Sequence, residues 1–308
     1  MKIVFMGNPQ FAVPSLRKLV ESDHDILSVV TNPPKPAGRG KQLIKSPVAE
    51  CAKELNLPII ETDELKSEKI LHTLRDLNGD VFAVVAYRIL PKKVINIPLK
   101  GAINLHGSLL PKYRGAAPIQ WALINGESET GLTTFIIQPK VDKGNILLQK
   151  TIKIDQDDNY GSLAEKMSHT GAELLVNTVD RFESENVEQY NQLDSNATLA
   201  PKITPALTNI SWEKSAKEIH NLIRGLAPFP GARTVLDSKT LKIFKTKYIE
   251  ENSTNNSGEI SNIGKDSFNV QTGKGQLIVL EVQVEGKRRM SAGDFLRGVQ
   301  LDIGKNLN

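Results

Sequence analysis

The sequence predicts an α/β fold: a Rossmann-like, doubly wound and mostly parallel sheet, followed by a small β-barrel of the OB-like kind. Short apolar runs alternate with helical patterns through the first half of the chain, which is typical of parallel strands joined by crossover helices. In the last third, short strands follow one another at a spacing of roughly ten residues, which is typical of a barrel. At roughly 100–200 residues per domain, the 308 residues make two domains.

The first half alternates between strand and helix in order. Residues 80–86 are almost continuously apolar, as in a strand buried on both faces, and Pro47 is suited to the first turn of a helix. Leu163, Met167 and Leu174 recur at helical spacing and indicate the inner face of a long helix. The expected strands are 2–6, 26–31, 80–86, 102–105 and 131–137, and the expected helices are 9–19, 47–55 and 159–184.

Asparagine, serine and proline residues then interrupt the pattern and mark a linker over 189–207. We therefore expect an N-terminal domain over 1–188 and a C-terminal barrel over 208–308. The elements expected in the barrel are a helix over 211–224 and strands near 233–237, 240–249, 258–263, 267–272 and 276–284.

Composition excludes several classes of protein. The single cysteine, Cys51, cannot form an internal disulfide framework or a multi-cysteine metal site. Apolar runs are too short for a membrane span or a signal peptide, so a cytoplasmic protein without a membrane partner is expected. The net charge is +4, and residues 201–308 carry the positive surplus. This surplus suits a polyanionic partner, although a solvated lysine-rich surface would explain the charge equally well.

Common catalytic and cofactor motifs do not fit. The turn Gly7-Asn8-Pro9-Gln10-Phe11 lacks the glycines of a dinucleotide site. The five histidines are scattered without metal-ligand spacing, so no metal is expected. Ser108 does not lie in a GxSxG motif, and Cys51 lies inside a helix with no residue nearby that favours a thiolate.

Asn104 and His106 form the most informative pair. They lie two residues apart at the end of an expected strand, so both side chains point to the same side of the sheet. Open α/β sheets bind ligands at the carboxyl ends of their strands. Asn104 could donate its amide to a developing oxyanion, and His106 could donate or transfer a proton. Asp142 would reach His106 if the strand 131–137 neighbours that of Asn104, although a turn-forming role is the plainer interpretation.

A second feature is the basic, glycine-containing stretch over 35–45. It carries four positive charges and no negative charge, which fits either a flexible phosphate-binding loop or a solvated charge run. The charged residues are Lys35, Arg39, Lys41 and Lys45.

Together these residues resemble the folate-dependent formyltransferases. The resemblance rests on Asn104, Asp142 and the stretch 106–111, which reads His-Gly-Ser-Leu-Leu-Pro. It covers nearly the whole chain. The loop 36–41, the run 114–120 and the motif Pro228-Phe229-Pro230-Gly231 resemble the branch of the family that acts on initiator tRNA.

The resemblance implies transfer of a formyl group from 10-formyltetrahydrofolate, a co-substrate rather than a tightly bound cofactor. The acceptor would be the α-amino group of methionine on initiator tRNA, and the product would serve translation initiation. The resemblance gives Asn104 and His106 to the oxyanion and Asp142 to His106 and proton transfer. The folate site would be lined by Ser108, Leu109, Leu110 and Pro111. A monomer without a DNA partner is expected.

The resemblance also implies that the 35–45 loop contacts the acceptor stem and that the barrel holds the tRNA backbone. The barrel residues proposed for phosphate contact rest on charge alone; they are Lys242, Lys245, Lys247, Lys287, Arg288 and Arg289. One departure from the family lies in Ala86-Tyr87-Arg88, where Arg88 stands in place of a glycine and the loop is one residue shorter. This loop borders the folate pterin in the family, so the pocket there is expected to differ.

Three alternatives remain at this point. The acceptor could be another amine, on a sugar nucleotide or a purine-pathway glycinamide, but a small acceptor would not need the basic loop or the basic C-terminal domain. Water could replace the amine, giving a hydrolase. A catalytically inactive tRNA-binding module is the third, and the presence together of Asn104, His106 and Asp142 argues against it.

Overall fold

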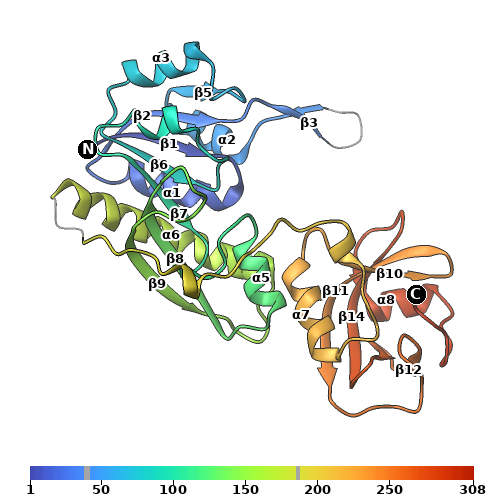
Figure 1. Ribbon diagram of the computed structural model, residues 1–308. Coiled ribbons are helices and arrows are strands. Elements are labelled where there is room, and N and C mark those ends of the chain that lie inside the picture. The colour runs from blue at the N-terminus through green and yellow to red at the C-terminus, as the bar shows by residue number, and fades with distance from the viewer. Residues whose placement is uncertain (38–41, 185–187) are drawn as a thin grey trace. The chain divides into compact units, whose positions relative to one another are not determined.

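A seven-stranded sheet forms the centre of the N-terminal part of the chain (Figure 1). The computed structural model describes residues 1–37, 42–184 and 188–308. Five strands run parallel and β8 runs antiparallel to β7, which confirms the predicted Rossmann-like, mostly parallel sheet. In their order across the sheet, the strands are β5 (Ile59–Glu61), β2 (Asp25–Thr31), β1 (Lys2–Gly7), β6 (Val81–Val85), β7 (Ala102–His106), β8 (Glu129–Ile136) and β9 (Ile146–Lys153).

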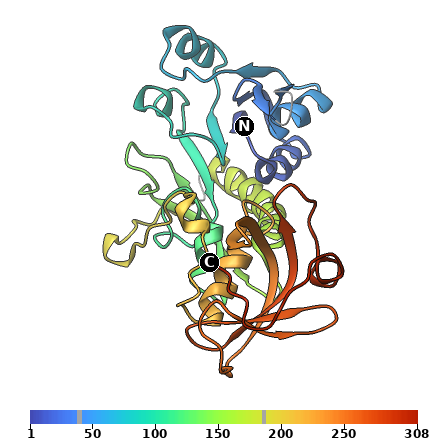
Figure 2. The same cartoon turned by 90° about the vertical axis from the view of Figure 1, so that its right-hand side faces the viewer.

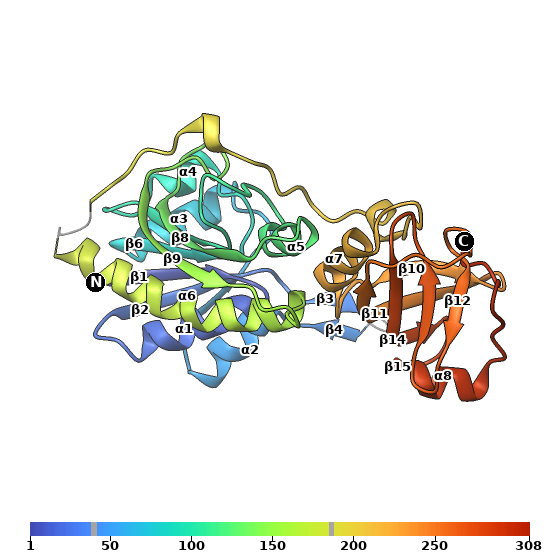
Figure 3. The ribbon, with the colours of Figure 1, turned by 90° about the horizontal axis from the view of Figure 1, so that it is seen from below.

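Helices cover both faces of this sheet. Figure 3 shows α3 and α4 on one side and α1, α2 and α6 on the other. Every residue of β6 is buried, as expected for a strand covered on both faces. The helices are α1 (Val13–Val20), α2 (Pro47–Glu54), α3 (Glu68–Asp76), α4 (Lys92–Ile95) and α6 (Tyr160–Glu183).

Local sequence explains where several helices begin. The Ser46 hydroxyl accepts the Ala49 N–H and Pro47 occupies the first turn, so α2 begins at the predicted place. Ser67 caps α3 in the same way. The predicted helix over 9–19 is shorter, because a 3₁₀ turn over Gln10–Ala12 precedes α1.

The basic stretch 35–45 contains a short β-ribbon rather than only a loop. β3 (Lys35–Ala37) pairs antiparallel with β4 (Gln42–Ile44), apart from the main sheet. The prediction of a flexible loop is therefore wrong for both ends of the stretch, because backbone pairing fixes them. Residues 38–41, which include Arg39 and Lys41, lie outside the described residues.

The C-terminal part has its own antiparallel sheet, seen from orange to red in Figure 2. The last residues join the outer strands β10 and β12. Val235 of β10 exchanges backbone hydrogen bonds with Asn308. Ile260 of β12 donates to the Lys305 carbonyl, and Leu307 donates to the carbonyl of Gly258, just before β12. These bonds complete a barrel-like ring. The strands are β10 (Ala232–Leu236), β11 (Lys239–Ile249), β12 (Ile260–Ile263), β13 (Phe268–Gln271), β14 (Gln276–Val284) and β15 (Met290–Ser291).

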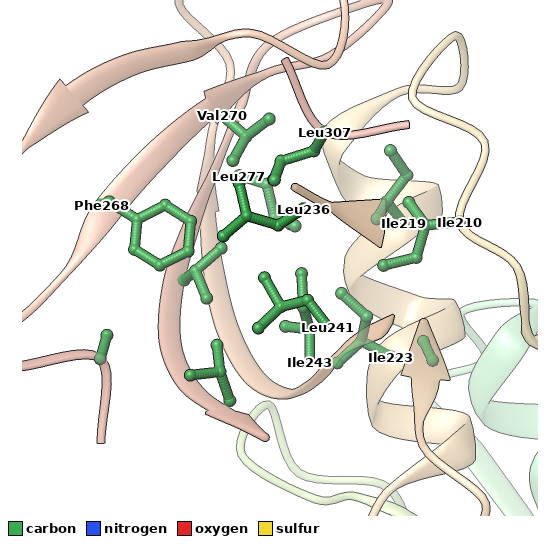
Figure 4. Close-up of a cluster of buried hydrophobic side chains, with 14 of the residues drawn as sticks. Ile210, Ile219, Ile223, Leu236, Leu241, Ile243, Phe268, Val270, Leu277 and Leu307 are labelled. Atoms are coloured by element: carbon green, nitrogen blue, oxygen red, sulfur yellow. The ribbon is translucent and has the colours of Figure 1, made fainter. Parts of the chain in front are cut away.

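Buried side chains from these strands and from α7 (Ala216–Leu226) fill the interior of the ring (Figure 4). Ile223 projects from α7 toward Leu241 and Ile243 of β11, and Ile219 lies beside Ile210. A capping box between Ser215 and Glu218 begins α7. The remaining helices are α5 (Pro118–Ile124), which packs against α7, and α8 (Ala292–Gly298).

The chain forms two compact units, and each unit is made of stretches that are separated in the sequence. The first unit holds 1–115, 130–153 and 164–200, and the second holds 116–129, 154–163 and 201–308. The stretch predicted as a linker over 189–207 is thus divided, with its residues up to Ala200 in the first unit. Among the described residues, no helix has the length and apolar character needed to cross a membrane.

Candidate active site

Strand β7 places Asn104 and His106 on the same face of the sheet. Phe82 and Val84 of β6 pair with Ala102 and Asn104, and they pack on the α3–α4 side. Helix α6 covers the opposite face of β7. There, a Cβ on Gly171 of α6 would lie 2.8 Å from Leu105 Cδ2. Asn104 is half-buried and His106 is buried. The predicted pair therefore projects from the end of β7 on the side away from α6.

Backbone contacts fix the imidazole of His106. Its Nε2 lies 2.9 Å from the Tyr113 carbonyl oxygen, and its ring meets Phe135 edge-on with centroids 6.4 Å apart. A carbonyl oxygen only accepts, so in this orientation Nε2 carries a proton and donates it. The other nitrogen, Nδ1, faces Asp142, with 4.0 Å between Nδ1 and Oδ2. His106 is thus oriented by one nitrogen and has the other available for chemistry.

Asp142 reaches His106 by a route that the sequence did not indicate. Its strand neighbours β7 as required, but β8 is antiparallel, so Ile136 at its carboxyl end pairs with Ile103 near the start of β7. The loop after β8 folds back to bring the carboxylate to His106. There Oδ2 accepts the Gly115 N–H at 2.8 Å, and the side chain is only 14% exposed.

Gly144 permits this return of the loop. A Cβ at that position would lie 1.5 Å from the Ile136 carbonyl oxygen. No side chain fits at that distance, so the chain must carry glycine to pass this close to its own strand. Asp142 itself has a φ of 51°, in the left-handed region that is costly for most residues other than glycine.

The stretch proposed for the folate is firmly built into the first unit. The Ser108 hydroxyl donates to the Lys112 carbonyl at 2.6 Å, and Leu110 packs with Phe135 and Ile146 in a small buried cluster. Thr133 on β8 accepts the Leu110 N–H at 3.0 Å. The side chains of Ser108 and Leu110 are therefore used within the unit, and the carbonyls of Ser108, Leu109 and Leu110 accept hydrogen bonds there as well. Of the four side chains, those of Leu109 and Pro111 stay half-buried.

Arg88, the departure noted in the sequence, bridges two loops at the carboxyl end of the parallel strands. Its guanidinium donates to the Asp63 carbonyl at 2.5 Å and to the Asn32 side-chain oxygen. It also lies over the ring of Tyr87, 5.6 Å from the centroid. Burial raises the pKa of the Tyr87 hydroxyl, so this phenol stays neutral at physiological pH.

The basic residues of the ribbon are only partly described. Lys35 on β3 is exposed, and Lys45, just beyond β4, is half-buried. Leu43 and Ile44 of β4 are exposed as well, at 70% and 55%. The described part of the ribbon therefore presents both charge and apolar surface.

The lysines of β11 lie on the outer face of the C-terminal sheet. Irregular pairing with β14 around Lys245 keeps Lys242, Lys245 and Lys247 outward while Leu241 and Ile243 face the core. Lys245 and Lys247 are exposed, whereas the Lys242 ammonium donates to the Pro230 carbonyl at 2.9 Å.

The three basic residues at 287–289, after β14, differ in whether their charge is already paired. Lys287 and Arg288 are exposed. Arg289 instead pairs with Glu281 through two hydrogen bonds of 2.7 and 2.6 Å and lies over the ring of Phe244. Its charge is already balanced, so Arg289 is the weakest of the proposed phosphate contacts.

Sequence reasoning missed the polar network that surrounds the Asp142 loop. Gln192 and Asp194 lie in the predicted linker, yet Gln192 bonds to carbonyls of this loop and Asp194 bonds to Arg114. Nothing in their local pattern separates them from ordinary loop residues. In the part of the chain that the structure describes, no group of three or more His, Cys, Asp or Glu side chains could hold a metal ion.

Comparison with sequence families gives two matches. A family described as "Formyl transferase" matches residues 1–179, and one described as "Formyl transferase, C-terminal domain" matches residues 202–300. A protein of Clostridioides difficile named "Methionyl-tRNA formyltransferase" is 42% identical, covering 99% of each chain. One of the same name from Geobacter metallireducens is 41% identical, over 100% of this chain and 98% of the relative.

Solved structures share the fold at lower identity. An N-formyltransferase from Helicobacter canadensis, solved with folinic acid and dTDP-3-aminofucose, has a TM-score of 0.66 and 20% identity, covering 94% of this chain and 100% of that one. HypX from Aquifex aeolicus, solved with tetrahydrofolic acid, has a TM-score of 0.66 and 18% identity, covering 98% of this chain and 48% of that one.

Proposed function

This chain belongs to the formyl transferase family, and from that premise we propose that it transfers the formyl group of 10-formyltetrahydrofolate to methionyl-initiator tRNA. The product is N-formylmethionyl-tRNA, which serves translation initiation. The observation that carries this function is identity of about two residues in five, over the full length, with relatives named for that activity. The sugar N-formyltransferase fold is shared at about half that identity.

The reaction exchanges one C–N bond for another. The neutral α-amino group of the methionyl ester attacks the formyl carbon, and a tetrahedral intermediate with a negatively charged oxygen forms. The bond between the formyl carbon and N10 of the folate then breaks. One proton moves from the amine to N10, so the products are the formylated ester and tetrahydrofolate.

The positions of Asn104 and His106 suit two side chains that donate hydrogen bonds to the oxyanion. They project from the same face of β7, so a single oxygen atom can be approached by the Asn104 amide and by an N–H of His106. Since Nε2 donates its proton to the Tyr113 carbonyl, Nδ1 is the nitrogen that would face the reacting group, and it donates to the oxyanion as part of a protonated ring.

Asp142 suits an electrostatic and proton-transfer role beside His106. The 4.0 Å between Nδ1 and Oδ2 is too long for a hydrogen bond, but it is short enough for the carboxylate to stabilise a protonated ring. Catalytic hydrogen bonds often tighten only when substrate is bound. Asp142 would then hold the proton that passes between the amine and N10.

The remaining basic and loop residues would make the contacts with the two substrates. The stretch Ser108–Pro111 would line the folate site, chiefly through the half-buried side chains of Leu109 and Pro111. Lys35, Arg39, Lys41 and Lys45 would contact the acceptor arm, and the outer lysines of β11 would contact phosphates. We further propose that the enzyme is a monomer and acts in the cytoplasm, where charged tRNA is used.

Formyl transfer with parallel acceptors tests this function. The protein is given 10-formyltetrahydrofolate with methionyl-initiator tRNA, with a UDP-aminosugar, or with no acceptor. Product on the tRNA alone supports the proposal. Product on the sugar supports the sugar-nucleotide alternative, and release of formate without acceptor supports a hydrolase; either result would overturn the proposal.

A further inference from the structure

Gln192 holds the loop that carries Asp142. Its Nε2 lies 2.9 Å from the Asp142 carbonyl oxygen and 2.8 Å from the Gly144 carbonyl oxygen. A side-chain amide nitrogen has two protons, so it can donate to both carbonyls at once. The two bonds clamp the loop on either side of Lys143, immediately beside the catalytic carboxylate.

Arg114 decides which way the Gln192 amide points. Its Nε and Nη2 lie 3.0 and 2.7 Å from Gln192 Oε1. A guanidinium can only donate, so the atom that faces it must be the amide oxygen, and the nitrogen must face the loop carbonyls. Arg114 is buried, and its fork of donors leaves the amide a single favourable orientation.

Asp194 completes the network by balancing the buried charge. Its carboxylate accepts from Arg114 Nη1 at 2.6 Å and from Lys143 Nζ at 2.8 Å. Bonds from Lys143 and Arg114 lower the pKa of Asp194 from 3.8 to about 2, so it stays ionised across the physiological range. Since Lys143 follows Asp142 directly, the catalytic loop is tied to this network by side chain as well as by backbone.

The segment that follows Asp194 also supports the backbone groups that hold His106 and Asp142. The Tyr113 N–H donates to Thr198 Oγ1 at 2.8 Å, and Arg114 exchanges backbone bonds with Thr198 and Ala200. Tyr113 supplies the carbonyl that orients His106. The next residue but one, Gly115, supplies the N–H that binds the Asp142 carboxylate.

We propose that Gln192 is a positioning residue for the formyl-transfer reaction, with its amide oriented by Arg114 and clamping the loop that presents Asp142 to His106. The proposal rests on the proposed function and goes beyond it. Asp142 has a left-handed backbone, a conformation that is uncommon outside glycine, and Gln192 bonds to the carbonyls on both sides of Lys143 next to it. Gln192 acts through Asp142 and does not itself touch the reacting atoms.

A double-mutant cycle with Asp142 tests the proposal. Gln192→Met keeps the length of the side chain but removes both donors, and we expect kcat for methionyl-tRNA to fall about 10- to 100-fold, the scale of a small misplacement of a catalytic group. In an Asp142→Asn background the same change should cost less than about twofold, because there is no functional carboxylate left to place. The KM values for tRNA and folate should change little.

Two further variants keep the result interpretable. Gln192→Glu retains the oxygen that Arg114 binds but cannot donate to either carbonyl, so it should lower kcat similarly while Tm stays near that of the parent. Gln189→Met removes the exposed contact between Gln189 and Asn145, which involves the same two segments but not the clamped carbonyls, and should leave kcat unchanged.

The outcomes separate this proposal from the proposed function. If the parent protein formylates no methionyl-tRNA, the proposed function fails before any variant is made. If the parent is active, then unchanged kcat in Gln192→Met and Gln192→Glu overturns the positioning role. So does an equal loss in the parent and Asp142→Asn backgrounds, and so does an Asp142→Asn protein that keeps full activity.

Discussion

His106 and Asp142 face each other across 4.0 Å, although they reach this position from strands that run in opposite directions. Each is held by a backbone group of the same short segment: Tyr113 accepts from the imidazole, and Gly115 donates to the carboxylate. Segment 113–115 therefore sets the spacing of the pair.

Replacing His106 tests the oxyanion role. We expect His106→Ala to lower kcat at least about a hundredfold, the scale for loss of one oxyanion donor, because Nδ1 is the ring nitrogen left for the substrate. Affinity for methionyl-tRNA, measured by filter binding, should stay within about twofold of the parent. Unchanged turnover would remove His106 from the mechanism.

Gly144 should tolerate no side chain. In Gly144→Ala the new Cβ would lie 1.5 Å from the Ile136 carbonyl oxygen, so the loop must shift and carry Asp142 with it. We expect the free energy of unfolding to fall by about 1–3 kcal/mol, as for other overpacked sites, and kcat to fall as well. Urea unfolding and steady-state kinetics measure the two effects.

Gly298→Ala is the matched control for that change. Gly298 ends α8, and a Cβ there meets nothing within 4 Å. This variant should match the parent in both stability and kcat. A Gly144→Ala protein as stable and active as Gly298→Ala would contradict the close approach of the loop to its strand.

The basic residues over 35–45 should contribute to the use of tRNA as substrate but not to the binding of folate. Arg39 and Lys41 follow β3, whose Lys35 is exposed, so we expect Arg39→Ala to lower kcat/KM for methionyl-tRNA while the Kd for tetrahydrofolate is unchanged. Isothermal titration with the folate and steady-state kinetics with the tRNA separate the two. Equal weakening toward both substrates would indicate a general loss of structure instead.

The outer lysines of β11 should give tRNA binding part of its salt dependence. Replacing Lys245 and Lys247 together by Ala should reduce the slope of log Kd against log salt by about two, since each phosphate contact contributes about one. Lys265→Ala, at an exposed turn of the same unit, serves as the control and should leave the slope unchanged. A slope that is the same in all three proteins would exclude β11 from the tRNA surface.

His220 should make stability depend on pH. Burial, aided by the charge of Arg224, lowers its pKa from 6.5 to about 4. The unfolded chain binds a proton near pH 6.5 that the folded chain does not accept until about pH 4, so the contribution is complete above pH 6.5 and is lost as the pH falls to 4. The loss reaches roughly 3 kcal/mol at pH 4.

Urea unfolding of the parent and of His220→Gln at pH 7 and pH 5 measures this effect. The parent should lose about 2 kcal/mol more than the variant between these two pH values. The same loss in both proteins would mean that other groups cause the acid sensitivity. The Thr246 hydroxyl, which lies 2.9 Å from Nδ1, can remain bonded to the glutamine.

Local patterns in the sequence predicted much of the N-terminal sheet, because strands buried on both faces must be apolar along their whole length. β6 and β7 lie where the apolar runs place them, and α6 extends from Tyr160 to Glu183 as its periodicity indicates. Short elements such as β5 and α4 were missed, since three or four residues carry too little pattern to be recognised.

By itself, the sequence determined the fold class, the family and the candidate pair Asn104 and His106, because residue type and a spacing of two are local properties. Only the tertiary structure decided how Asp142 reaches His106 and that Gln192 holds its loop. The antiparallel course of β8 depends on pairing between distant strands, and the orientation of the Gln192 amide depends on Arg114. Contacts between residues far apart in the chain leave no periodic signal in the sequence, so no local pattern could have revealed them.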